Sequence, residues 1–137
     1  MDTLTPQQRS ERMSRVKSSG SRAERLVRST VHRLGYRFRL HAKKLPGTPD
    51  LVFPVRRKAI FVHGCFWHRH PDPDCRLARL PKSRHEFWLP KLEGNRARDL
   101  RNLAALESMG WRTLELWECK LHDLPSLENE IRTFLDS

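Results

Sequence analysis

Two short stretches of the sequence concentrate side chains that can bind metal ions or move protons. Asp50 follows the segment LPGTP (residues 45–49) and opens a short apolar run. A second apolar run, residues 59–62, leads directly into HGCFWHRH (residues 63–70), which holds three histidines in eight residues. A carboxylate is a hard oxygen ligand for Mg²⁺, and a nearby histidine can serve as a general base or contact a phosphate. The pattern predicts metal-assisted phosphodiester cleavage; the alternative is an aspartate that caps a turn beside structural histidines.

The cysteines suggest a second, different metal site. Cys65, His70 and Cys75 are separated by equal gaps of four residues, and Cys119 can reach them from a distant segment. Three cysteines and one histidine form a common tetrahedral set for structural Zn²⁺. An odd number of cysteines behind an N-terminus without an apolar leader favours reduced thiols and a cytoplasmic location over a disulfide scaffold. Three unrelated buried thiols remain the alternative.

The elements expected to position these residues form one α/β domain with a central mixed sheet flanked by helices. A helix is expected from Ser21 to Gly35, in which Glu24 completes a capping box with Ser21. Residues 63–84 are expected to form an irregular loop ordered by metal. The other expected elements are a short basic helix or arm at 5–17, strands at 36–40, 51–53, 59–62 and 111–118, and helices at 86–109 and 125–135. The packed side of the helix at 86–109 is expected to carry Leu100, Leu103, Ala104 and Leu106, and Trp111 and Trp117 are assigned to packing.

The charge distribution points to a polyanionic partner. The 137 residues carry a net charge of +11, and the first 44 contain 12 basic and 3 acidic side chains. The last 38 residues are mildly acidic, with 4 basic and 7 acidic side chains. The longest mostly apolar stretch, residues 59–67, is too short to span a membrane. A nucleic acid is therefore the expected partner.

Several motifs together resemble the very short patch repair endonucleases. They are LPGTPD (45–50), FVHGCFWH (61–68), HEFWL (85–89), Asn95, Arg98-Asp99, Gly110-Trp111-Arg112 and WEC (117–119). The resemblance covers about residues 8–120. It implies a restriction-endonuclease-like fold with a structural zinc, and Mg²⁺-dependent nicking of double-stranded DNA on the 5′ side of the thymine in a T:G mismatch left by deamination of 5-methylcytosine. It also implies a monomer, a link to a cytosine-5 DNA methyltransferase, and cooperation with a mismatch-repair matchmaker protein.

The resemblance also implies a role for individual residues. Asp50 and the main-chain carbonyl of Val62 match metal contacts, and His68 matches the catalytic histidine, with Glu24 and His63 in support. The implied zinc ligands are Cys65, His70, Cys75 and Cys119. The aromatic side chains Phe66, Trp67 and Trp88 match a wedge that enters DNA beside the mismatch, a use that would explain aromatics exposed on a polar loop; core filling is the alternative. Met13 matches a residue of an N-terminal arm, residues 1–20, that contacts DNA, and residues 21–137 would form the endonuclease domain.

Two other functions fit parts of the pattern. A related nuclease with a different mismatch or sequence specificity would use the same motifs. A non-catalytic, zinc-ordered nucleic-acid-binding module would explain the charge and the cysteines, but it would leave Asp50 and His68 without a purpose.

Overall fold

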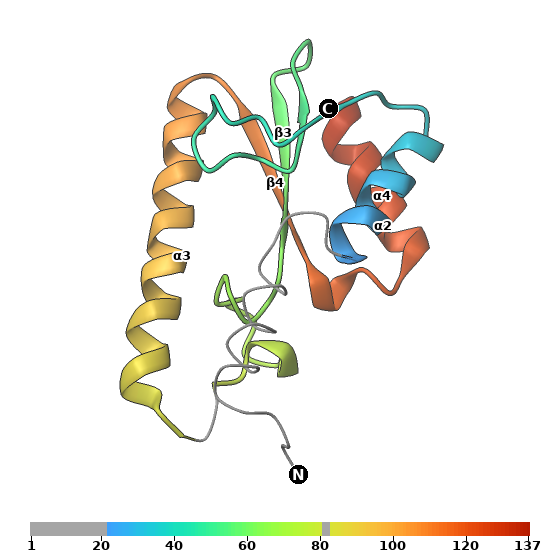
Figure 1. Ribbon diagram of the computed structural model, residues 1–137. Helices are drawn as coiled ribbons and strands as arrows, with labels where there is room; N and C mark the ends of the chain where they lie inside the picture. Colours follow the sequence, from blue (N-terminus) through green and yellow to red (C-terminus); the bar gives the residue numbers. More distant parts are fainter. Residues whose placement is uncertain (1–21, 81–82) are drawn as a thin grey trace.

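A computed structural model describes residues 22–80 and 83–137, which form a mixed α/β domain (Figure 1). Its principal elements are α2 (Arg22–Arg33), β1 (Arg39–Leu40), β2 (Leu51–Phe53), β3 (Lys58–His63), α3 (His85–Ser108), β4 (Arg112–Trp117) and α4 (Leu124–Asp136). Two short 3₁₀ helices, η1 (Arg76–Ala78) and η2 (Glu118–Lys120), lie in the connections. Each long element expected from the sequence within these ranges is present, with boundaries that differ by a few residues.

The sheet has four strands in the order β1-β2-β3-β4. β1 pairs with β2 and β2 with β3 in antiparallel fashion, whereas β3 and β4 run parallel. The expected mixed sheet is therefore confirmed. In the parallel pair, His63 lies opposite Trp117, so both strands end level at one edge of the sheet.

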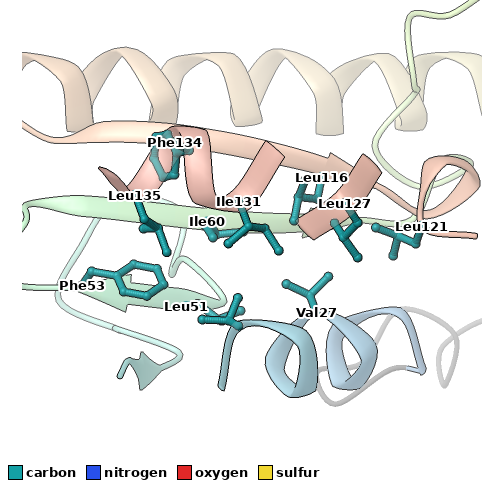
Figure 2. Close-up of a cluster of buried hydrophobic side chains, with 11 residues drawn as sticks. Val27, Leu51, Phe53, Ile60, Leu116, Leu121, Leu127, Ile131, Phe134 and Leu135 are labelled. Carbon is teal, nitrogen blue, oxygen red and sulfur yellow. The ribbon is translucent and has the colours of Figure 1, made fainter. Parts of the chain in front are cut away.

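Helices cover both faces of this sheet. α2 and α4 lie on one side and the long α3 on the other (Figure 1). The core between the sheet and the α2–α4 layer is apolar (Figure 2) and consists of Val27, Val31, Leu51, Phe53, Ile60, Leu116, Leu121, Leu127, Ile131, Phe134 and Leu135. Because successive side chains of a strand point to opposite faces, Ile60 and Val62 pack toward this core while Phe61 and His63 face α3.

Polar contacts stabilise both ends of α4, and those at its C-terminus tie the helix to β3. The carboxylate of Asp123 accepts a hydrogen bond from the backbone N–H of Ser126, which caps the first turn. At the other end the buried ammonium group of Lys58 donates to the carbonyl oxygens of Phe134 (2.8 Å), Leu135 (3.0 Å) and Ser137 (2.7 Å). A cation at the C-terminus of a helix satisfies carbonyl groups that lack partners within the helix.

The loop before Asp50 packs tightly against α3. Gly47 has a φ of +76°, and a Cβ at this position would lie 3.0 Å from the Cβ of Asn102. The backbone N–H of His41 donates to the carbonyl of Asp50, which closes the loop at its base. Glycine is required at residue 47 both for the backbone conformation and for the close approach.

The packed side of α3 is only partly the one expected from its apolar residues. Of the four residues expected there, Leu106 is buried and Leu103 is partly buried, but Leu100 is 51 % exposed and Ala104 is also exposed, which contradicts the prediction for those two. Leu92 is buried as well, and the residues between Leu92 and Leu106 that share their face are mostly polar. Among the helices of residues 22–80 and 83–137, none combines the length and apolar character needed to cross a bilayer.

Candidate functional site

Asp50 lies at the start of β2, with its carboxylate directed at the neighbouring strand. Its Oδ2 accepts a hydrogen bond of 2.7 Å from the backbone N–H of Val62. Burial raises the pKa of Asp50 to about 6; the Val62 hydrogen bond opposes this rise, and the negative charge of Glu24 adds to it. A cation bound nearby would stabilise the charged form of this carboxylate and so lower its pKa.

Glu24 and His41 meet beside Asp50. The carboxylate of Glu24 is 2 % exposed and is hydrogen-bonded to Nε2 of His41, and Arg28 lies 3.9 Å from its other oxygen. One potential ligand atom from each of Glu24, His41 and Asp50 lies within 4.8 Å of the other two. Ser21 lies outside the described residues, so the capping box stays a prediction; the carboxylate of Glu24 faces the site.

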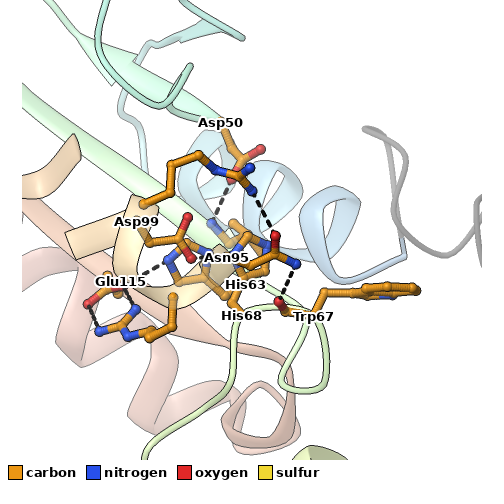
Figure 3. A network of polar contacts seen from close by, with 10 residues as sticks. Asp50, His63, Trp67, His68, Asn95, Asp99 and Glu115 are labelled. Atoms are coloured by element: carbon orange, nitrogen blue, oxygen red, sulfur yellow. Dashed lines mark hydrogen bonds and ion pairs between the residues drawn. The ribbon is translucent and has the colours of Figure 1, made fainter. Parts of the chain in front are cut away.

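His68 and His63 form a second cluster on the side of the sheet that faces α3 (Figure 3). Nδ1 of His68 is 2.6 Å from Oδ2 of Asp99, which α3 contributes. The rings of His63 and His68 stack with their centroids 4.2 Å apart. Asp99 therefore fixes the orientation of the His68 ring, and His63 supports its face.

A carboxylate and a guanidinium hold His63 in turn. Nε2 of His63 is 2.8 Å from Oε2 of Glu115 on β4, and Arg96 of α3 donates to both oxygens of Glu115 at 2.7 and 3.3 Å. Burial alone would raise the pKa of Glu115, but the hydrogen bonds from His63 and Arg96 lower it to about 2. Burial lowers the pKa of His63 despite its contact with Glu115. Glu115 is thus held as an anion between His63 and Arg96.

The structure brings the four predicted zinc ligands together: Cys65, His70, Cys75 and Cys119 each offer a ligand atom within 4.8 Å of the others. Cys65 and Cys75 are buried, and burial raises the pKa of Cys65 to about 12. Three soft thiolate donors and one imidazole suit tetrahedral Zn²⁺, and the charge of a bound metal is what deprotonates such buried thiols. The cluster can therefore hold zinc.

Trp117 joins the zinc-ligand cluster to the histidines. Its ring stacks on His70 at a centroid distance of 4.3 Å and lies 4.8 Å from His63, and the guanidinium of Arg96 covers it at 5.2 Å. The ring is a packing residue, as the sequence predicts, and it lies between the predicted zinc ligand His70 and His63.

Phe66, Trp67 and Trp88 form one aromatic cluster. Phe66 lies 5.2 Å from Trp67 and 5.5 Å from Trp88, measured between ring centroids, and the amide of Asn95 donates to the carbonyl of Trp67 at 3.1 Å (Figure 3). Trp67 is only 6 % exposed, which agrees with the core-filling alternative for this ring; its entry into DNA stays a prediction. It packs against the other rings because apolar surface is more stable there than in water. Met13 lies outside the described residues.

Comparison with known proteins identifies the family. The sequence model of the family described as DNA mismatch endonuclease Vsr matches residues 1–76. A protein of Xanthomonas oryzae named type II nicking enzyme V.XorIIP is 55 % identical over 98 % of this chain and 97 % of its own length. The DNA mismatch endonuclease Vsr of Escherichia coli is 39 % identical over 91 % of this chain and 78 % of its own length.

The chain belongs to the Vsr family of DNA mismatch endonucleases. The resemblance stated from the motifs is thereby confirmed, and so is the expectation of an endonuclease. A further Vsr-type relative, from Neisseria meningitidis and named type II nicking enzyme V.NmeAIP, is 37 % identical over 88 % of this chain and 84 % of its own length.

Three residues of the site, His41, Arg96 and Glu115, have no role in the expectations drawn from the motifs, and Asp99 appears there only as part of a motif. Asn95, Arg96, Asp99 and Asn102 lie between the buried Leu92 and Leu106 at helical spacing. A polar stripe bounded by buried leucines is a usable signal, because it marks a helix face that packs against other polar groups. His41 carries a different signal, a positive φ of 47°, which only the structure reveals.

Proposed function

We propose that this protein is a Mg²⁺-dependent, strand-specific nickase that cleaves double-stranded DNA on the 5′ side of the thymine in a T:G mismatch, as arises when 5-methylcytosine is deaminated. One observation carries the proposal. In a member of the Vsr family, the buried carboxylate of Asp50 accepts a hydrogen bond from Val62 of β3, and this strand leads directly into the loop that carries His68, whose ring Asp99 orients.

The donor set around Asp50 fits Mg²⁺. Hard oxygen donors suit this ion, and Asp50 is buried beside a second carboxylate, Glu24, so that a cation offsets repulsion between them. Asp50 and the main-chain carbonyl of Val62 are the proposed ligands. Bound there, Mg²⁺ would neutralise charge that develops on the phosphate during cleavage.

The residues around His68 are suited to proton transfer. An ionised Asp99 accepts the Nδ1–H of His68, which leaves Nε2 as the acceptor for a proton from the attacking water. His63 cannot offer its Nε2 at the same time, because that atom faces Glu115. We therefore assign proton transfer to His68 and a positioning role to His63, with Glu24 supporting the metal site.

The aromatic cluster is the proposed wedge for the mismatch. Phe66 and Trp67 lie on the loop that carries His68, and Trp88 packs against them from the first turn of α3, so insertion and cleavage would be linked through that loop. A T:G wobble pair stacks less well than a matched pair, and unstacking it costs less of the few kcal/mol required. Selectivity would then depend in part on how easily the DNA deforms.

Residues 1–20, including Met13, are proposed as a basic arm that contacts DNA, and residues 21–137 as the endonuclease domain. Zinc bound by the Cys65 cluster would be structural and would hold the loop that carries His68. We further propose that the protein acts as a monomer in the cytoplasm of a bacterium, alongside a cytosine-5 DNA methyltransferase and a mismatch-repair matchmaker protein. The bacterial sources of the relatives support this setting.

A second candidate differs only in substrate. The 55 % identical relative is named a type II nicking enzyme and not a mismatch endonuclease, which supports, as the second candidate, a related nickase with a different mismatch or sequence specificity. One experiment separates the two: nicking of duplexes with every mismatch in varied flanking sequence, with Mg²⁺ or with EDTA. We expect cleavage of the thymine strand at T:G alone, and none in EDTA. Equal cleavage of matched duplexes, or of both strands, would refute the proposal.

A further inference from the structure

His41 occupies an unusual backbone position next to the proposed metal site. It follows β1 directly, and its φ of 47° lies in the left-handed region, which costs a residue with a Cβ about 1–2 kcal/mol. Its N–H donates to the carbonyl of Asp50, so residues 41 and 50 are held together at the base of the loop. Backbone strain of this kind is maintained at functional sites, where it fixes the direction of a side chain.

The side chain of His41 points to the carboxylates. Nε2 meets Oε1 of Glu24, a group with a 3 % exposed side chain, and the ligand atoms of Glu24, His41 and Asp50 lie within 4.8 Å of one another. The His41 side chain is 31 % exposed, so ions from solvent can reach it. One nitrogen and two carboxylate groups thus converge from α2, the end of β1 and the start of β2.

This donor set differs from an all-oxygen Mg²⁺ site. Mg²⁺ favours carboxylate, carbonyl and water oxygens, whereas Mn²⁺ shares these oxygen ligands but, as a first-row transition metal ion, also accepts an imidazole nitrogen. Addition of an imidazole to two carboxylates should therefore raise the affinity for Mn²⁺ more than the affinity for Mg²⁺.

We propose that His41 is a ligand of the Asp50 metal site, and that with Glu24 and Asp50 it makes this site bind Mn²⁺ more tightly than Mg²⁺. The inference rests on the proposed function, because it assumes a metal ion at Asp50. It adds a third side-chain ligand and a preference among divalent cations.

The test measures metal binding directly, without DNA or turnover. Protein with a full complement of zinc is titrated with Mn²⁺, and the free ion is followed by its electron paramagnetic resonance signal; Mg²⁺ is then added as competitor. The variant His41→Asn removes the imidazole while asparagine tolerates the left-handed backbone. We expect it to weaken Mn²⁺ binding by about tenfold or more and to change Mg²⁺ binding by less than about threefold.

The control His32→Asn changes an exposed histidine of α2 and should leave both affinities unchanged. If His41 only holds Glu24 in place, His41→Asn will weaken Mn²⁺ and Mg²⁺ binding equally, and the inference is wrong; unchanged Mn²⁺ binding overturns it as well. Asp50→Asn tests the underlying proposal separately. Should that variant bind both ions like the parent protein, the metal site itself, and not merely the role of His41, is misplaced.

Discussion

Replacement of Asp99 by asparagine is expected to slow nicking while leaving the fold and DNA binding intact. Asp99 is the only described carboxylate that contacts His68 through a hydrogen bond, at 2.6 Å, and its side chain is 13 % exposed. Asparagine has nearly the same shape, but it is neutral and can turn its NH₂ group toward the ring. His68 would then lose the partner that holds its proton on Nδ1, and Nε2 would no longer be reliably free to accept one.

The expected size of the effect follows from that contact. A hydrogen bond to a charged group contributes about 1.5–3 kcal/mol. If this contribution applies to the transition state, in which His68 becomes positively charged, its loss slows cleavage roughly 10- to 150-fold. The effect should be on the rate of cleavage and not on affinity, because Asp99 is not proposed to contact DNA.

Single-turnover nicking of an end-labelled T:G duplex at saturating enzyme isolates the cleavage step, and fluorescence anisotropy of the same duplex in EDTA reports binding. Glu93→Gln is the matched control, since it neutralises an exposed carboxylate on the same helix. A rate for Asp99→Asn within about threefold of the parent protein, with unchanged binding, would show that His68 does not depend on this carboxylate.

Three further predictions concern stability and metal content. The folded-state pKa of Glu115 is lowered to about 2, so its contribution to the free energy of unfolding is fully present above the usual value of 4.5 and is lost as the pH falls toward 2. The variant Glu115→Gln should therefore be less stable than the parent protein by about 1–3 kcal/mol at pH 7. In urea titrations this difference should shrink toward zero between pH 4.5 and pH 2. A gap that stays constant with pH would mean that Glu115 is not stabilised as an anion. Gly47→Ala should lower the free energy of unfolding by about 2 kcal/mol, through its positive φ and the contact with Asn102, and an unchanged urea midpoint would contradict the geometry of that loop. Cys119→Ser should reduce the zinc content, measured by elemental analysis, from about one ion per chain to well below one, and it should lower the melting temperature. Full zinc occupancy in this variant would show that Cys119 is not a zinc ligand.

The apolar pattern predicts most of the fold. β2 and β3 are short runs of buried residues, and α4 has a regular apolar stripe. Both patterns have simple physical causes, because each element must bury one face or both. For α3 the same reasoning is right for Leu106 but wrong for Leu100 and Ala104, because the face toward the sheet carries the polar residues Asn95, Arg96 and Asp99. A helix that contributes polar groups to a site cannot also present a continuous apolar stripe there.

Some residues of the candidate site can be predicted from the sequence and others cannot. Asp50, His68 and the four zinc ligands are recognisable because they lie in short motifs, with local spacing that suits their chemistry. Glu115 and His41 lie just outside those motifs in sequence, and their part in the site depends on the pairing of β3 with β4 and on the closing of the loop before Asp50. A single sequence contains no signal for such contacts, because they depend on strand register and on one unusual backbone angle.

The level ends of β3 and β4 have a mechanical consequence. His63 and Trp117 are opposite each other in register, and the four zinc ligands come from the segments that leave these two strands at the same edge. A side chain that pushes bases apart experiences an equal and opposite force on its own loop. The zinc-ligand cluster connects the ends of β3 and β4 and would transmit this force to the whole sheet, where many hydrogen bonds resist it. The loop of Phe66 and Trp67 would then not bend away from the DNA.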